Sequence, residues 1–151
     1  MKICENLKTL SNTVIGLGFF DGVHLGHREL INQVVKTAQK INLKSVILTF
    51  KKSPAESFCT NVKYLTTNSE KELLITNLNV DYLFELDFNT LINMTAYDYL
   101  KDIIINYFKP KYIYTGYNHT FGKDKSGNPQ LLLNCSKEQS LMTTALSFMP
   151  L

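Results

Sequence analysis

Two kinds of apolar pattern alternate along the chain. Short runs rich in β-branched residues, each ended by glycine, proline or polar residues, predict buried strands. Longer segments in which apolar side chains recur every three or four positions predict helices that are apolar on one side. The predicted strands lie at 13–18, 45–50, 80–85, 112–115 and about 141–147. The predicted helices lie at 26–42, 67–78, 95–107 and through 131–133.

The segment 51–67 has no such periodicity and predicts a long loop, with a short strand near Tyr64. Thr67 followed by Glu70 predicts a capping box where the next helix begins.

Strands that alternate with helices predict an α/β fold, a parallel sheet of about five strands with helices on both faces. In such sheets ligands bind beyond the carboxyl ends of the strands. Polar clusters follow three of the predicted strands, namely DGVHLGH, KKSP and GYNHTFGKDKSG. The sequence therefore predicts a binding site at that edge of the sheet.

The composition is that of one ordinary globular domain over residues 1–151, with 44% hydrophobic residues and a net charge of +3. The basic residues are scattered, which argues against a nucleic-acid-binding or membrane-binding surface. Cys4, Cys59 and Cys135 form no zinc-binding or disulfide pattern. The N-terminus lacks the apolar core of a signal peptide, and no apolar run could span a bilayer. We therefore expect a reduced, cytoplasmic protein that binds small molecules and holds no metal of its own.

The segment GFFDGVHLGH, residues 18–27, lies where the first strand ends and the first helix begins. Gly26 lies near the helix N-terminus, where free N–H groups attract anions. His24 and His27 are three residues apart, so both imidazoles can face one point. This arrangement predicts a receptor for phosphate oxygens that stabilises negative charge during transfer at phosphorus. Part of a metal site, or two surface histidines, are the simpler alternatives.

The strand–GFFDGVHLGH–helix segment resembles the HxGH nucleotidyltransferases, and in particular the bacterial FAD synthetases. A second block, GYNHTFGKDKSGN at 116–128, resembles the flavin-contacting loop of that family. The resemblance covers nearly the whole chain and implies a Rossmann-like nucleotidyltransferase fold. It also implies FMN adenylyltransferase activity, in which AMP passes from ATP to FMN to give FAD and pyrophosphate, with Mg²⁺ bridging phosphate oxygens.

The resemblance also implies roles for individual residues. His24 and His27 would be catalytic. The implied nucleotide-binding residues are Gly18, Phe20, Asp21, Gly22, His24, Gly26 and His27. The implied flavin-binding residues are Ser53, Pro54, Asn118 and Phe121. For Asp21, which lies in a DG turn, holding the turn together is an equal alternative.

The chain departs from the family pattern at several places. Phe19 stands where the family commonly has asparagine, Lys52-Ser53-Pro54 replaces a proline–histidine–proline turn, and His119 replaces an aromatic residue. Four lysines are predicted at the same edge of the sheet, where they would be solvated or would contact a triphosphate: Lys51, Lys52, Lys123 and Lys125.

The family's serine–serine–threonine turn with its following arginine does not occur by Leu151, and Thr143-Thr144 is no substitute. The riboflavin kinase module that normally follows is absent as well. We therefore expect either a chain that was cut short or a divergent relative with reduced activity. Two alternative functions stay open: an HxGH nucleotidyltransferase with another acceptor, and a catalytically weak protein that binds flavin or nucleotide. The missing arginine and Ser53 favour the second.

Overall fold

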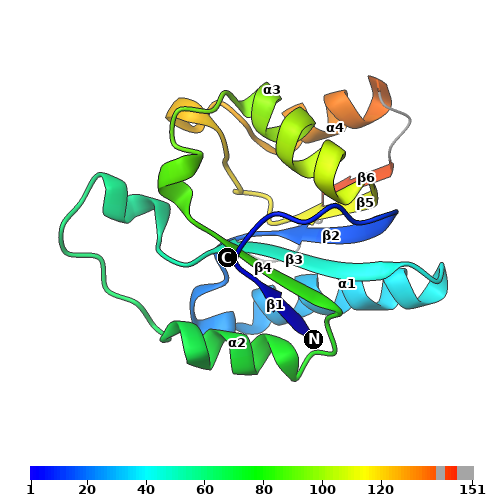
Figure 1. Ribbon diagram of the computed structural model, residues 1–151, viewed down its shortest axis with the longest axis horizontal. Coiled ribbons are helices and arrows are strands. Elements are labelled where there is room, and N and C mark those ends of the chain that lie inside the picture. The colour runs from blue at the N-terminus through cyan, green and yellow to red at the C-terminus, as the bar shows by residue number, and fades with distance from the viewer. Residues whose placement is uncertain (139–141, 146–151) are drawn as a thin grey trace.

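A six-stranded sheet forms the centre of the computed structural model, which describes residues 1–138 and 142–145 (Figure 1). The strand order is β1-β4-β3-β2-β5-β6, and each neighbouring pair is parallel. The strands are β1 (Lys2–Cys4), β2 (Thr13–Leu17), β3 (Lys44–Phe50), β4 (Tyr82–Leu86), β5 (Pro110–Thr115) and β6 (Met142–Ala145).

The five predicted strands are confirmed as β2 to β6, although positions 141, 146 and 147 of the last prediction lie outside the described residues. The sixth strand, β1, was not predicted. It has only three residues and pairs with β4 at the edge of the sheet, where Ile3 is 46% exposed. A strand this short and this exposed has neither an apolar run nor an alternating pattern by which the sequence could reveal it.

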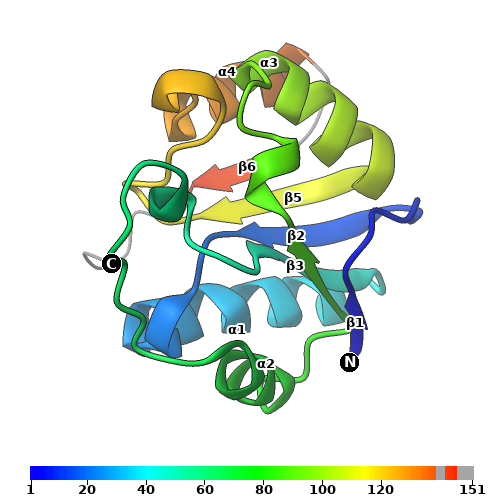
Figure 2. The ribbon, with the colours of Figure 1, turned by 60° about the vertical axis from the view of Figure 1, so that its left-hand side comes forward.

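Helices cover both faces of the sheet, as expected (Figures 1 and 2). One face carries α1 (Leu25–Lys40) and α2 (Asn68–Thr76). The other carries α3 (Ala96–Asp98), which continues into the π-helix η4 (Tyr99–Phe108), and α4 (Pro129–Glu138). The predicted capping box at the start of α2 is confirmed, because Glu70 N donates to Thr67 Oγ1 and Thr67 N donates to Glu70 Oε2.

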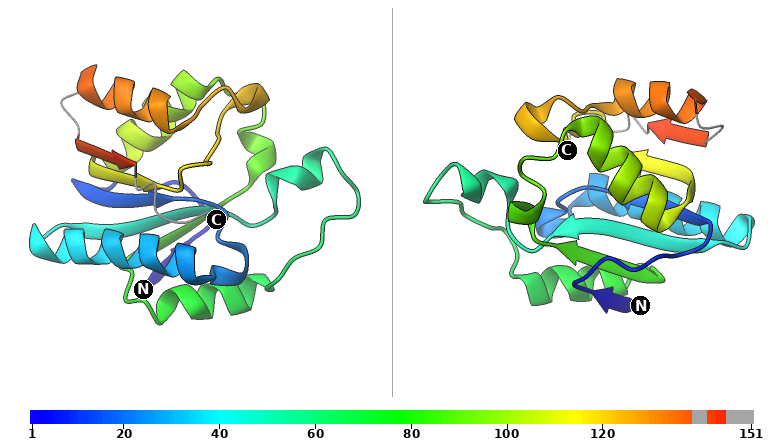
Figure 3. Two further views of the ribbon diagram at one scale, coloured as in Figure 1. Left: turned by 180° about the vertical axis from the view of Figure 1, so that it is seen from behind. Right: turned by 45° about the horizontal axis from the view of Figure 1, so that its top comes forward.

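The predicted short strand near Tyr64 is wrong. Segment 51–67 extends beyond the carboxyl end of the sheet (Figures 1 and 3) and therefore has no neighbouring strand with which to pair. Side-chain contacts order it instead: the Tyr64 hydroxyl accepts the N–H of Ser53 at 2.9 Å and donates to the Glu56 carboxylate.

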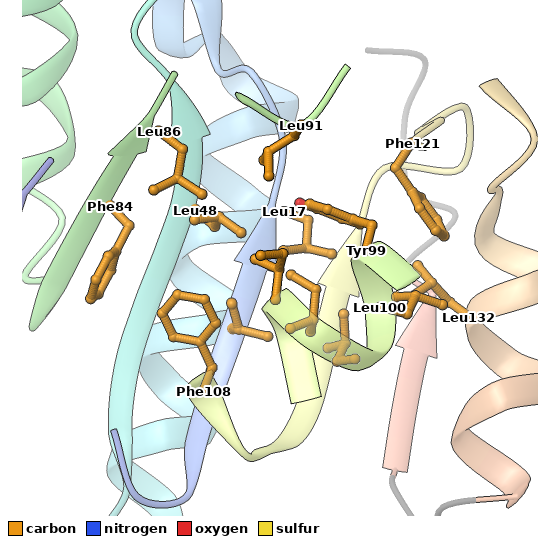
Figure 4. Packing of buried hydrophobic residues seen from close by; sticks show 14 of the residues in the cluster. Leu17, Leu48, Phe84, Leu86, Leu91, Tyr99, Leu100, Phe108, Phe121 and Leu132 are labelled. Atoms are coloured by element: carbon orange, nitrogen blue, oxygen red, sulfur yellow. The ribbon is translucent and has the colours of Figure 1, made fainter. Parts of the chain in front are cut away.

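The core has one apolar cluster on each side of the sheet. The cluster beneath α3, η4 and α4 contains Phe84 and Phe108, whose rings meet edge to face at 4.9 Å (Figure 4). The cluster beneath α1 and α2 contains Val14, Ile31 and Ile47. All five residues of β2 are buried, as befits a central strand of a parallel sheet covered on both faces.

The chain changes direction across the sheet at β2. From β2 it proceeds to β3 and then β4, whereas β5 pairs with the other side of β2. The loops that leave the carboxyl ends of β2 and β5 therefore diverge to opposite faces. This is the position at which open α/β sheets form a ligand-binding crevice.

The loop after β5 is held against the start of α3. Lys123 N donates to Met94 O at 2.8 Å, and Phe121 pairs with Gly127 in a short antiparallel bridge. Gly122 has a φ of +76°, and a Cβ added there would lie 2.5 Å from the Cα of Ala96. Only glycine fits this close approach of two backbones.

We predict that Gly122→Ala lowers the free energy of unfolding by about 2 kcal/mol or more, because the new Cβ meets backbone atoms and the φ is positive. Urea unfolding measures this. Asp124→Gly in the same turn is the control: Asp124 also has a positive φ, of 56°, so glycine there should stay within about 1 kcal/mol of the wild type. Equal losses in both variants would contradict the prediction.

Candidate functional site

The turn that follows β2 is backbone-strained. Within Phe20–Val23 three residues have positive φ angles: 58° at Phe20, 74° at Gly22 and 40° at Val23. For a bulky or β-branched residue this conformation is unfavourable, and it persists only where the surrounding structure enforces it. Such turns cluster at functional sites.

The Asp21 carboxylate holds this turn in place. It accepts hydrogen bonds from the backbone N–H groups of Leu65 and Thr66, at 3.0 and 3.1 Å, and from Thr66 Oγ1 at 3.3 Å. Gly22 N donates to the same threonine oxygen at 3.1 Å. Two segments more than forty residues apart are thereby joined, and the oxygens of Asp21 are occupied by protein donors.

Phe20 lies under the turn and is 1% exposed. Its ring passes so close to Gly18 that a Cβ at that position would lie 2.9 Å from the ring, so glycine is required there. The ring meets the imidazole of His27 edge on, at 5.3 Å. The turn therefore supports one of the two histidines from below.

The imidazoles of His24 and His27 stack on each other, with ring centroids 3.6 Å apart and planes 19° apart. His24 is the N-cap of α1, and its Nδ1 accepts the N–H of His27 at 3.4 Å. An Nδ1 that accepts carries no proton, so a neutral His24 carries its proton on Nε2, where it can donate. The N–H groups of Leu25 and Gly26 precede the first intrahelical bond, which runs from Arg28 N to His24 O. The start of α1 thus combines imidazole donors with free backbone donors.

His27 is neutral at physiological pH. Its pKa is lowered to about 4, chiefly by burial and then by the neighbouring His24, while Asp21 acts in the opposite direction. Its Nδ1 is buried without a hydrogen-bond partner. A neutral imidazole in this position can donate a hydrogen bond without adding a full charge to a partly buried site.

A cavity of about 420 Å³ opens beside this histidine pair. Its walls come from the loops at the carboxyl ends of β2, β3 and β5, as the change of chain direction predicts. The lining residues are Leu17, Gly18, Phe19, Phe20, Asp21, His24, His27, Leu30, Phe50, Pro54, Leu65, Gly116, Asn118, His119 and Thr120.

The structure brings most of the predicted nucleotide-binding residues to this cavity. Five of the seven line it: Gly18, Phe20, Asp21, His24 and His27. Gly22 and Gly26 do not line it. Gly22 donates its N–H to Thr66, and Gly26 is buried in the first turn of α1.

The predicted flavin-binding residues divide evenly. Pro54 and Asn118 line the cavity. Ser53 does not, because its Oγ accepts from Ala55 N and caps the short helix η2 (Pro54–Ser57). Phe121 is 8% exposed and packs against Tyr99, with ring centroids 5.6 Å apart, within the core cluster (Figure 4). Phe121 therefore anchors the loop after β5 to the core.

The four lysines considered for phosphate binding are not among the lining residues. Lys51 pairs with Glu5 at 2.8 Å, and Lys52 lies 3.9 Å from Glu56. Lys123 and Lys125 belong to the short turn η5, on the outer part of the loop after β5. These contacts favour solvated lysine side chains over lysines that contact a triphosphate.

Several lining residues gave no signal in the sequence. Leu65 is 78% exposed and reaches the cavity only because Asp21 binds the backbone beside it. His119 was noted as a loop residue, and burial lowers its pKa to about 4. Its Nε2 is buried without a hydrogen-bond partner. The position of His119 in the polar loop after a predicted strand was the one available signal.

Among the described residues, no group of three or more His, Cys, Asp or Glu side chains could hold a metal ion. None of the helices within the same residues is both long and apolar enough to cross a membrane.

Comparison with known proteins agrees with this geometry. The model of the FAD synthetase family matches residues 6–149. The chain is 35% identical over 133 residues to the bifunctional riboflavin kinase/FMN adenylyltransferase of Buchnera aphidicola subsp. Schizaphis graminum, covering 85% of this chain and 42% of that protein. It is 28% identical to the Escherichia coli K12 protein of the same description, covering 96% of this chain and 49% of that protein. The chain therefore spans less than half the length of these curated relatives.

A solved structure described as a macrolide-efflux protein from Streptococcus pneumoniae superposes with a TM-score of 0.73 and 29% sequence identity. The match covers 87% of this chain and 46% of that one. Because the family model spans nearly the whole sequence, including both the histidine turn and the loop after β5, the chain belongs to the FAD synthetase family.

Proposed function

We propose that this chain transfers AMP from ATP to FMN and releases FAD and pyrophosphate. The observation that carries the proposal is the stacked pair of His24 and His27 at the start of α1, on the wall of a cavity that also includes the loop after β5. Family membership supports the same reaction, because the named relatives are FMN adenylyltransferases.

In the proposed complex the triphosphate lies over the start of α1. His24, through Nε2–H, and His27 would donate to phosphate oxygens, and the helix dipole would favour their charge. A phosphate oxygen of FMN attacks the α-phosphorus of ATP in line, the new P–O bond forms, and the bond to the β-phosphate oxygen breaks. Pyrophosphate carries away the electron pair. No side-chain nucleophile takes part, so catalysis rests on positioning and on stabilisation of the charge that develops.

The cavity suits planar rings joined to phosphates. Leu17, Phe50 and Leu65 provide apolar wall, whereas the polar groups gather at the histidine pair and the loop after β5. An apolar cavity with few, localised polar groups is typical of a cofactor-sized site. Its volume of about 420 Å³ lies within the range of such sites.

In the proposed reaction, magnesium would reach the site bound to ATP. Among the described residues that line the cavity, Asp21 is the one acidic residue, and its carboxylate is bound to Leu65 and Thr66. A metal ion would accordingly arrive on the phosphates of ATP, where it neutralises charge, and not on a set of protein ligands. Magnesium commonly binds proteins in this way.

We predict that His27→Ala lowers the rate of FAD formation by about 10²- to 10³-fold, the usual effect of removing one donor to a developing charge. The assay follows FAD and pyrophosphate from ATP and FMN. CTP in place of ATP, and phosphopantetheine in place of FMN, test the other members of the superfamily.

The control is Lys36→Ala, on the exposed side of the same helix, which should keep the wild-type rate and fold. A His27→Ala variant with unchanged kinetics refutes the role of the histidine. A wild type that binds ATP and FMN tightly without releasing pyrophosphate refutes the reaction.

We also predict that ATP binding is linked to proton uptake by His27. Burial holds its pKa near 4 in the free protein, and a bound phosphate favours the protonated form and raises that pKa. The complex therefore binds more protons than the free protein, so affinity rises as the pH falls from 7 to 5. The measurement is the ratio of the Kd for ATP in His27→Asn to that in the wild type, since the titration of ATP itself affects both proteins equally. The ratio should grow toward low pH. A ratio that is constant with pH contradicts the linkage.

A further inference from the structure

A buried lysine lies behind the wall of the proposed substrate cavity. Lys71 of α2 is 2% exposed, and its Nζ donates to the carbonyl of Phe50, a cavity residue, at 3.0 Å. Glu85 of β4 is equally buried, and its Oε1 lies 3.8 Å from the same Nζ. Burial raises the pKa of Glu85 to about 7, and Lys71 opposes that rise. The two side chains are thus held away from water near a site that neither of them touches directly.

The ammonium of Lys71 also lies over an aromatic ring. The centroid of the Phe19 ring is 4.8 Å from Nζ, within the range of a cation–π interaction. Phe19 is half-buried and lines the cavity directly before the Phe20–Val23 turn. Its carbonyl accepts from Thr49 Oγ1 at 2.8 Å, and its ring lies 6.0 Å from that of Tyr64. The residue is therefore held by contacts from three different segments.

The geometry favours the ring over the carboxylate as the partner that Lys71 is built to hold. At 3.8 Å the Glu85 contact is too long for a hydrogen bond, and Glu85 Oε1 has no hydrogen-bond partner. The Phe50 carbonyl at 3.0 Å and the Phe19 ring at 4.8 Å, in contrast, lie within the usual ranges for a hydrogen bond and a cation–π contact, and both belong to the cavity wall. A buried ion pair with imperfect geometry adds little to stability, because desolvation offsets the attraction. Glu85 serves here as the counter-charge that makes the buried ammonium tolerable.

We propose that Lys71 is a positioning residue, whose ammonium holds the Phe19 ring against the cavity as a surface on which a planar ring of the substrate packs. This inference rests on the proposed function for the identity of that ring, which is the flavin of FMN or the adenine of ATP. Lys71 does not touch the substrate. It acts through Phe19, and the two side chains should therefore behave as one unit in binding.

A double-mutant cycle on equilibrium binding tests this inference. The proteins are the wild type, Lys71→Met, Phe19→Leu and the double variant, and the measurement is the Kd for FMN and for ATP separately. Each single variant should weaken binding of one of these ligands by about 5- to 30-fold, the effect of a partly desolvated cation–π contact. The double variant should bind no more weakly than Phe19→Leu alone. Additive losses, or unchanged Kd values for both ligands, overturn the proposal. The ligand whose Kd rises identifies the ring.

Replacing both Lys71 and Glu85 separates the effect of Lys71 on the position of Phe19 from its effect on the stability of the fold. Lys71→Met leaves Glu85 buried and unpaired, whereas Lys71→Met/Glu85→Gln removes both charges and should regain thermal stability. If Lys71 positions Phe19, the Kd of this pair variant stays as weak as that of Lys71→Met. If Lys71 is only a structural element, the Kd returns to that of Glu85→Gln. Should Lys71→Met fail to fold, the same cycle with Phe19→Leu is run in the Glu85→Gln background.

The rate of FAD formation by the wild type distinguishes a failure of the proposed function from a failure of the role proposed for Lys71. A wild type that forms no FAD overturns the proposed function, while the Kd cycle still decides the role of Lys71. In an active protein, Lys71→Met should raise the KM for one substrate by the same factor as its Kd and leave kcat within about two-fold, because the histidine pair is untouched. A loss confined to kcat overturns the positioning role.

Discussion

The site depends on one contact between distant parts of the chain, the binding of the Asp21 carboxylate to the backbone of Leu65 and Thr66. The turn that it holds contains three positive φ angles. Bulky and β-branched residues such as Phe20 and Val23 adopt such angles only where the surrounding structure enforces them. Because α1 begins immediately after this turn, the same contact sets where the helix N-terminus lies. It also brings Leu65 to the cavity. An acidic residue within the motif thus holds the backbone of the proposed phosphate site in place.

The parallel sheet determines which loops can meet around that turn. The chain reverses direction across the sheet at β2, so the loops after β2 and β5 leave on opposite faces and open a crevice between them. The two faces are packed by separate apolar clusters, and β2 is buried between them. The histidine turn is therefore attached to a central strand that is buried along its whole length. The loop after β5 gains its own rigidity from the contact of Gly122 with Ala96.

The cavity wall combines imidazole groups at its surface with a buried ammonium behind it. His27 is neutral at physiological pH, and His24 caps α1 through a nitrogen that carries no proton. The ammonium of Lys71 is in contact with Phe19 and with the Phe50 carbonyl, but lies out of reach of a ligand. In the proposed complex, most of the charge in the site would therefore belong to the anionic substrate. In the proposed reaction the protein would contribute fixed dipoles and positions, which need little rearrangement during transfer of AMP.

The sequence by itself determined the alternation of strands and helices, the capping box at Thr67 and Glu70, and the association of His24 with His27. Each of these depends on residues within a few positions of one another, where periodicity and spacing express the geometry directly. Only the tertiary structure decided that Asp21 binds the segment before α2, that Phe121 belongs to the core, and that Lys51 pairs with Glu5. The same holds for β1, whose three residues become a strand only because the edge of β4 offers hydrogen bonds. Contacts between residues forty or more positions apart depend on how the sheet is ordered, and no local pattern encodes that order.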